Sequence, residues 1–187
     1  MNNFLLSIAA IVVFVLAVLF AVPPFIDWNT YRGMFEEEVS RLIDREVRVQ
    51  GRVNVRILPV PFVSFEKVRI ADETGISGSF VRADQFKMWL SVPPLLRGII
   101  EARQIELEKP VLRLRIAEDG SGNWQSLSIR DSNLAFLPRD VALNSVVIDD
   151  GMVVFEQHTG QEIARLSKLS GELSAAALRG PYKFVGS

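Results

Sequence analysis

The chain opens with a long apolar run and then changes to short alternations of apolar and polar residues. Residues 4–22 are apolar apart from Ser7, and no charged side chain precedes Asp27. A helix of this length spans about 28 Å, close to the hydrocarbon core of a bilayer, and satisfies its own backbone in lipid. The pattern predicts a membrane anchor over residues 1–26. The side chains that would contact lipid are Phe4, Leu5, Leu6, Ile8, Ile11, Val12, Val13, Phe14, Leu16, Leu19 and Phe20.

A cleaved signal peptide is the alternative interpretation of this run. The apolar stretch is long for a signal peptide, residues 1–3 supply no Lys or Arg, and no small-x-small pair precedes a cut near Ala21. Pro23 and Pro24 would end the helix, and Trp28 and Tyr31 follow where aromatic rings prefer the membrane interface. These features favour an uncleaved anchor.

Charge alone does not decide which side of the membrane the rest of the chain occupies. Arg32 and Arg41 follow the anchor, so a strict positive-inside count weakly favours the cytoplasm. Long domains, however, cross membranes largely regardless of such charges. The orientation stays open at this level.

Residues 27–46 show the spacing of an amphipathic helix. Apolar residues recur three and four positions apart, and Asp27 or Asn29 can cap the first turn. We expect this helix to pack on a sheet. Its apolar positions are Tyr31, Phe35, Val39, Leu42 and Ile43.

From Val47 the period changes to two, which is typical of strands with one apolar face. Gly51 marks a turn or bulge, and Pro59 and Pro61 close this first unit. Turn signals include 73–75, 119–120, 149–151 and 159–160, and a helical turn is expected at 93–97. Without βαβ spacing, the sheet is predicted to be antiparallel and meandering. Further strands are expected at residues 63–65, 68–70, 85–92, 102–107, 111–116, 145–149 and 152–156.

Composition narrows the chemistry that the chain can perform. The 21 basic and 22 acidic residues give a net charge of −1, so no electrostatic reason points to a nucleic acid partner. Cysteine is absent, which excludes thiolate nucleophiles and zinc–thiolate sites. No metal-ligand spacing occurs, and we expect neither a metal nor a cofactor.

Candidate catalytic residues are few. His158, the single histidine, lies in a polar segment and is interpreted as part of a surface turn. The sequence Gly120-Ser121-Gly122 has neither the Lys nor the strand-to-helix context of a phosphate loop, and a hairpin turn is expected instead. Scattered carboxylates leave a glycosidase-like pair, and so an anchored hydrolase, as an alternative. The expectation is a protein that is not an enzyme.

Several segments together resemble the N-terminal region of the AsmA family, membrane-anchored envelope proteins of Gram-negative bacteria. The match runs from the anchor and the amphipathic helix through residues 47–53 and Leu58-Pro59-Val60-Pro61. It continues through 95–98, 107–112 and 178–182, and the segment 119–124, which contains the hairpin residues Gly122, Asn123 and Trp124, resembles the family's Gly-x-Asn-Trp signature. One departure is Arg45-Glu46, where the family often has Thr-Gly before its first strand.

The resemblance implies a periplasmic domain anchored in the inner membrane and a role in outer-membrane biogenesis. It also implies kinship with bridge-like lipid-transfer proteins, whose curved β-sheets form open apolar grooves. Residues 47–187 would then be a β-groove domain that holds phospholipid acyl chains, with the alternating Arg and Lys facing water and Asn123 and Trp124 pinning a hairpin. The candidate groove residues on this basis are Val49, Val53, Val55, Phe86, Met88, Leu90, Leu112 and Leu114.

Two alternatives remain beside the groove. Alternation cannot distinguish an open groove from a closed sandwich or barrel whose core is filled by the same side chains. An assembly or regulatory factor that binds outer-membrane proteins or their assembly proteins through a sheet edge is the second function considered. About ten strands would give a groove near 50 Å, which suits the first section of a longer β assembly or a truncated relative.

Overall fold

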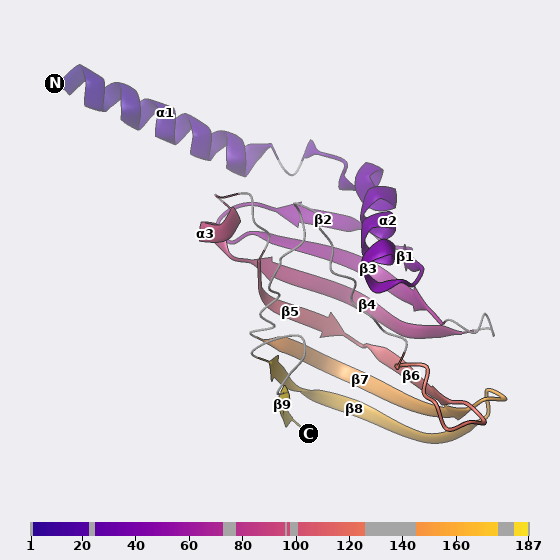
Figure 1. Ribbon diagram of the computed structural model, residues 1–187. Coiled ribbons are helices and arrows are strands. Elements are labelled where there is room, and N and C mark those ends of the chain that lie inside the picture. Colours follow the sequence, from indigo (N-terminus) through magenta and orange to yellow (C-terminus); the bar gives the residue numbers. More distant parts are fainter. Residues whose placement is uncertain are drawn as a thin grey trace.

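The computed structural model describes residues 2–22, 25–72, 78–95, 97, 101–125, 145–175 and 182–186. It begins with the straight helix α1 (Asn2–Ala21), which projects away from the rest of the chain (Figure 1). An 18-residue window of α1, Phe4–Ala21, is long and apolar enough to cross a membrane, and none of it is buried in the protein. The predicted apolar helix is confirmed, and α1 is a candidate membrane span.

The amphipathic segment is shorter than the sequence predicts. Asp27 caps the 3-10 helix η2 (Trp28–Tyr31) by accepting a hydrogen bond from the Asn29 N–H at 3.0 Å. The helix α2 (Arg32–Ile43) follows and ends at Asp44, whose φ of 55° is left-handed. A left-handed residue cannot continue a helix, so the predicted helix of residues 27–46 is reduced to these two elements.

One sheet of nine strands contains nearly all the remaining structure in the described ranges, in the order β1-β3-β4-β5-β7-β8-β9. Two strands lie off this path. β2 pairs with β3, as β1 does, and β6 pairs with both β4 and β7, as β5 does. The strands are β1 (Val47–Val49), β2 (Val53–Arg56), β3 (Phe62–Ala71), β4 (Ser79–Leu90), β5 (Ala102–Glu108), β6 (Val111–Ile116), β7 (Val146–Gln157), β8 (Glu162–Ala175) and β9 (Tyr182–Gly186). The short helix α3 (Val92–Leu95) joins β4 to β5, as the helical turn predicted at 93–97 indicates.

The sheet is mixed, so the prediction of a purely antiparallel meander is wrong. β5 and β6 both pair with β4 in antiparallel fashion, and both pair with β7 in parallel fashion. The chain therefore does not reverse at Lys109-Pro110. β5 and β6 run in the same direction, and β7 returns on their other side with that same direction.

Polar side chains from η2 and α2 cover the outer edge of β1 and β2. The Val47 N–H donates to Ser40 Oγ at 2.8 Å, and the Val49 N–H donates to Glu36 Oε1 at 2.6 Å. Asn29 Oδ1 accepts from the Val53 N–H at 3.0 Å. An open strand edge invites pairing with other chains, and these contacts close this one.

A row of left-handed residues crosses the sheet at one level. Lys67 in β3, Lys109 between β5 and β6, Asp150 in β7 and Lys168 in β8 have φ values of 54°, 47°, 51° and 60°. The strand register places these residues at one level of the sheet. Gln85, Glu108 and Asp149 are direct cross-strand partners, and Lys109 and Asp150 each follow one of them in the chain. Gly51, between β1 and β2, donates its N–H to Glu66 O at 3.0 Å at the same level. We call this row the crease.

The crease divides the sheet into two halves. Left-handed residues interrupt the two-residue alternation of a strand, and the apolar series shifts by one residue at this level. In β3, for example, Val63 and Phe65 are followed by Val68 and Ile70. The near half, beside α3, comprises β2, 62–66, 85–90, β5, 146–149 and 171–175. The far half comprises β1, 68–71, 79–83, β6, 151–157 and 162–169.

Several strand limits correct the sequence interpretation. The turn predicted at 149–151 is wrong, because these residues lie inside β7, where Asp150 supplies the crease. Segments 63–65 and 68–70 form the single strand β3, and β8 was not predicted. The turns at 119–120 and 159–160 are confirmed, with Gly120 and Gly160 at φ of 80° and 82°. The turn predicted at 73–75 lies outside the described residues.

Candidate functional site

The near half carries two rows of apolar cross-strand neighbours. Directly paired residues share one side of a sheet, so each row lies on one face. The face is that of Phe65, whose ring packs edge-on against Phe35 of α2 at 5.4 Å and contacts Phe86 at 6.1 Å. One row is Val53, Phe65, Phe86, Leu107 and Ile148; the other is Val55, Val63, Met88, Ile105, Val146 and Leu173.

Four of the eight candidate groove residues, Val53, Val55, Phe86 and Met88, therefore lie together in the near half. Leu112 and Leu114 lie in the far half, opposite Val153 and Phe155 of β7. The two remaining candidates lie apart from these groups. Val49 pairs with Val68 in the far half, and Leu90 ends β4 opposite Ala102.

Apolar side chains in both halves of the sheet are only partly covered. Val55, Met88, Leu112 and Leu114 are half-buried, and Leu166, opposite Val153, is 52% exposed. Among the described residues, no large side chain is fully buried. A filled sandwich core would normally contain such side chains.

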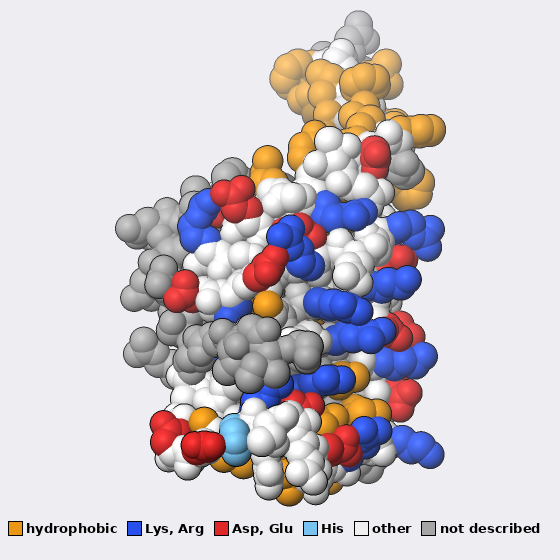
Figure 2. Space-filling view, turned by 90° about the vertical axis from the view of Figure 1, so that its right-hand side faces the viewer, with side chains coloured by type: hydrophobic (Ala, Val, Ile, Leu, Met, Phe, Trp, Pro, Cys, Tyr) orange, Lys and Arg blue, Asp and Glu red, His pale blue; other side chains and the backbone are white. Residues whose placement is uncertain are grey.

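All the predicted lipid-facing side chains of the anchor lie in α1, and each is exposed. Figure 2 shows these apolar side chains gathered at one end of the molecule, apart from the charged side chains that cover the described surface below. Such exposure suits a bilayer rather than water.

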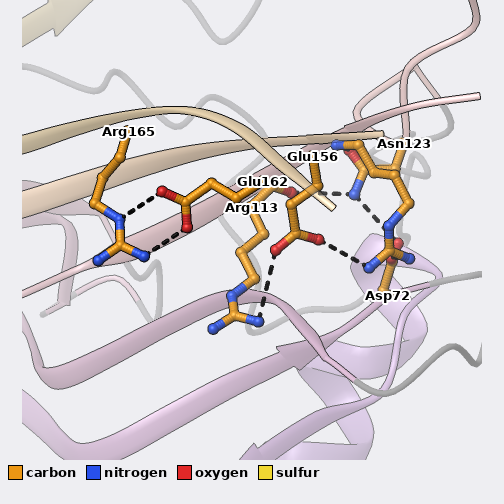
Figure 3. A network of polar contacts seen from close by, with 7 residues as sticks. Asp72, Arg113, Asn123, Glu156, Glu162 and Arg165 are labelled. Carbon is orange, nitrogen blue, oxygen red and sulfur yellow. Dashed lines mark hydrogen bonds and ion pairs between the residues drawn. The ribbon is translucent and has the colours of Figure 1, made fainter. Parts of the chain in front are cut away.

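A network of buried charged side chains fixes the far half. Arg115 Nη1 lies 2.6 Å from Asp72 Oδ2, and Arg115 Nη2 lies 3.1 Å from Glu156 Oε2. The side chains of Arg115, Asp72 and Glu156 are exposed by only 6%, 3% and 9%. Arg113 adds a longer contact to Glu156, 3.8 Å between Nη1 and Oε1 (Figure 3). Buried charges are tolerated when paired in this way.

Asn123 joins this network to the hairpin after β6. Its amide accepts from the Arg115 N–H at 3.0 Å, and donates to Arg113 O at 3.1 Å and Asp72 Oδ1 at 3.3 Å. The Asn123 carbonyl accepts from Arg45 Nη2, and the Arg45 guanidinium lies 4.5 Å from the centre of the Phe80 ring. A Cβ at Gly122 would lie 2.4 Å from the Trp124 ring, so a larger residue there requires this ring to shift. These contacts agree with the expectation that Asn123 pins a hairpin.

Sequence reasoning missed most of this network. The alternating Arg residues were expected to face water, and Arg48, Arg52, Arg69 and Arg82 are exposed, but Arg115 is buried and that expectation is wrong for it. Its partner Asp72 lies 43 residues earlier in the chain, so no local pattern could have indicated the pair. The one sequence signal of this network was Arg45, where the chain departs from the family pattern.

A cavity of about 300 Å³ lies between residues 26–29, which follow α1, and the strands β2, β3 and β4. Its lining is mainly polar, and includes Asp27, Asn29, Ser64 and Gln85. Arg52 Nη2 lies 3.2 Å from Glu66 Oε1 there, and a hydrogen bond from Arg52 lowers the pKa of Glu66 from its ordinary value. This polar cavity does not suit an acyl chain.

The other chemistry-bearing residues lie on the surface. His158 occupies an exposed turn, as expected, with Nε2 2.9 Å from Glu118 Oε1. Within the described ranges, no three His, Asp or Glu side chains are placed to hold a metal ion.

The model of the AsmA family matches residues 3–181, nearly the whole chain. Comparison with curated proteins gave no match, and neither did comparison with solved structures. The family match agrees with the N-terminal apolar helix, the strand-rich domain and the Gly122-Asn123-Trp124 hairpin. The chain therefore belongs to the AsmA family, membrane-associated proteins with a role in assembly of the cell envelope and outer membrane.

Proposed function

We propose that this protein binds phospholipid acyl chains along the apolar face of its sheet and so assists lipid movement during envelope assembly. The observation that carries the proposal is an apolar sheet face on which Val55, Phe86 and Met88 are only half-buried. A guest hydrocarbon would complete that face. Each methylene transferred from water to such a surface gains about 0.8 kcal/mol, so no covalent step is needed.

The dimensions of the sheet suit a lipid tail. The row Val55, Val63, Met88, Ile105, Val146 and Leu173 crosses six strands, which at about 4.8 Å each span about 24 Å. One leaflet's hydrocarbon layer is about 15 Å thick, half of a bilayer core. On this proposal the face is an open groove, the candidate residues on it act collectively, and the protein is not an enzyme.

Photo-crosslinking from neighbouring positions tests the groove. Leu112 and Arg113 are adjacent in β6 and both half-buried, but they face opposite sides of the strand. A benzophenone amino acid at Leu112 of the full chain in native membranes should capture phospholipid, and the same probe at Arg113 should capture several-fold less. Equal capture at both positions, or none at Leu112, would count against the groove.

The orientation is also a proposal: α1 in the inner membrane and residues 27–187 in the periplasm. Family membership and the candidate span α1 support it. The chain contains no cysteine, so Thr159→Cys, in an exposed turn, provides a single label site. A membrane-impermeant maleimide should label this variant in cells whose outer membrane alone is permeabilised. Labelling only after disruption of the inner membrane would reverse the assignment.

An assembly factor for outer-membrane proteins is the second candidate, favoured by the edge of β8. β9 pairs with residues 171–175 only, and within the described residues 162–169 have no neighbour on that side. Ile163 and Leu166 are 54% and 52% exposed there. A peptide strand could add to this edge. A crosslinker at Leu166 that captures an outer-membrane or assembly protein, with no lipid captured at Leu112, would favour this function.

A further inference from the structure

We propose that one end of the sheet rests on the membrane surface, in contact with anionic lipid headgroups. The contact surface, which we call the rim, consists of the turn Leu58–Pro61 between β2 and β3 and the helix α3 (Val92–Leu95). The inference requires α1 to cross the membrane but does not depend on lipid binding by the sheet face.

The two parts of the rim form one surface. The Leu90 N–H donates to Pro61 O at 2.9 Å, so the turn and the start of α3 are neighbours. Val60 and Val92 project from them with exposed fractions of 43% and 46%. Prolines at 59, 61, 93 and 94 restrict the backbone of both segments, so these apolar side chains are presented with little freedom to withdraw.

A cluster of cations and aromatic rings lies beside the rim. Phe62 and Trp89 pair across β3 and β4, with ring centres 5.1 Å apart. Lys87 Nζ lies 4.4 Å from the centre of the Trp89 ring and 5.1 Å from that of Phe62. The Arg56 guanidinium approaches the other side of this group, 5.9 Å from the centre of the Phe62 ring. Tryptophan and basic side chains together are typical of the headgroup level of a membrane.

Charge distinguishes this end of the sheet from the other. Of residues 56–62, 87–95, 97, 101–106, 145–147 and 172–175, which the strand register places at this end, four are basic (Arg56, Lys87, Arg97 and Arg103) and three are acidic (Glu101, Glu106 and Glu172). At the opposite end, residues 71–72, 78–79, 116–122 and 157–162 include no Lys or Arg. They carry four carboxylates: Asp72 and Glu162, which are paired with Arg115 and Arg165, and Glu118 and Asp119. An anionic surface would attract the rim and repel the far end.

The tether places the rim within reach of the bilayer. Seven residues, 22–28, separate α1 from Asn29 and span at most about 24 Å. Asn29 is hydrogen-bonded to Val53, and the seven steps from Val53 to Val60 along β2 and its turn cover at most about 23 Å. Figure 1 shows α1 extending toward the end of the sheet that carries α3. The rim therefore touches the membrane when the strands point toward it.

Single-cysteine labelling of the full chain in vesicles tests the rim. Val60→Cys and Val92→Cys report on it, and Ile163→Cys, 54% exposed in the far half, is the matched control. Each variant carries an environment-sensitive fluorophore in vesicles of phosphatidylcholine with phosphatidylglycerol and a doxyl-labelled lipid quencher. We expect quenching at both rim sites several-fold above that at Ile163. Quenching at the rim sites no greater than at Ile163 would overturn the proposal.

A charge-reversed variant tests the role of the headgroups. Arg56→Glu with Arg103→Glu should bring rim quenching close to the Ile163 level, and omission of phosphatidylglycerol should do the same without a mutation. Unchanged circular dichroism shows that the variant is folded; if it is not, the lipid comparison alone decides. Rim quenching that persists without anionic lipid would overturn the assignment to anionic headgroups. Capture of lipid at Leu112 is measured separately, so failure of either proposal is recognised independently.

Discussion

The two halves of the sheet are held together by different kinds of interaction. In the near half, α2 packs on the strands through aromatic rings, Phe35 on Phe65 and Phe65 on Phe86. In the far half, buried charged side chains hold the structure together: Arg115 lies between Asp72 and Glu156, and Arg45 is hydrogen-bonded to Asn123. The free energy lost on trimming an aromatic ring depends on how much of its volume is removed. A buried charge that loses its partner destabilises the fold by several kcal/mol in a single substitution.

Removing Arg115 should give the largest effect. Arg115→Ala removes the closest guanidinium from the carboxylates of Asp72 and Glu156, which keep longer contacts to Arg45 (3.9 Å) and Arg113 (3.8 Å), and removal of one member of a buried pair costs about 3–5 kcal/mol. Urea unfolding of the full chain in detergent measures the loss. The control is Arg165→Ala, which removes an exposed pair with Glu162 and should change the stability little. Similar losses in both variants would contradict the distinction between the halves.

Trimming the aromatic contact should cost less. Phe65 is half-buried, so Phe65→Ala is expected to lower the free energy of unfolding by about 2–3 kcal/mol, below the usual range for a fully buried ring. Phe65→Leu keeps much of the volume and should cost about 1 kcal/mol. The same urea experiment gives both values. A loss for Phe65→Ala larger than for Arg115→Ala would reverse the comparison.

The crease itself can be tested at Gly51. A Cβ there would lie 2.4 Å from Glu66 Cβ and 2.8 Å from Glu66 O, so Gly51→Ala forces β2 and β3 apart and should cost about 1–3 kcal/mol. Gly33 in α2 has no atom within 4 Å of such a Cβ. Gly33→Ala should therefore stabilise the protein by up to about 1 kcal/mol. Shifts of the thermal midpoint in opposite directions for the two variants would confirm this prediction. Equal shifts would contradict it.

A small pH effect is expected where the linker meets the near half. The Arg52 hydrogen bond lowers the pKa of Glu66 in the folded state below its ordinary value of 4.5. The contribution is therefore present above pH 4.5 and is lost as the pH falls through the lower folded pKa. The Glu66 side chain is 35% exposed and that of Arg52 is 81% exposed, so screening by solvent keeps the effect small. Arg52→Ala should destabilise slightly at pH 7 and not at pH 3 in thermal melts; an equal loss at both values would exclude this linkage.

The sequence predicted those features that local patterns encode. The apolar run of α1, the break at Gly51, the helical turn α3 and the turns at Gly120 and Gly160 all depend on residues within a few positions. The crease was misread at Asp149-Asp150-Gly151, because a left-handed residue within a strand and a reversal of the chain share the same residue types. The parallel pairing of β5 and β6 with β7 was missed because the absence of βαβ spacing was interpreted as an antiparallel meander.

The site was predicted less completely than the fold. Alternation identified apolar positions such as Val55, Met88 and Leu112 but could not assign them to halves, because the phase shift at the crease depends on register between strands. It also placed Arg115 in water, since nothing near it in sequence indicates Asp72 or Glu156. Long-range ion pairs of this kind become visible only when the strands are aligned.

The side chains of Asn29, Glu36 and Ser40 give the sheet a direction of growth. They already occupy the outward N–H groups of Val53, Val49 and Val47. The carbonyl groups of a strand added at that border would find these N–H donors already occupied. At the opposite border of the described sheet, residues 162–169 of β8 are still available for pairing. Any lengthening of this sheet, by its own chain or another, therefore proceeds away from the border next to η2 and α2.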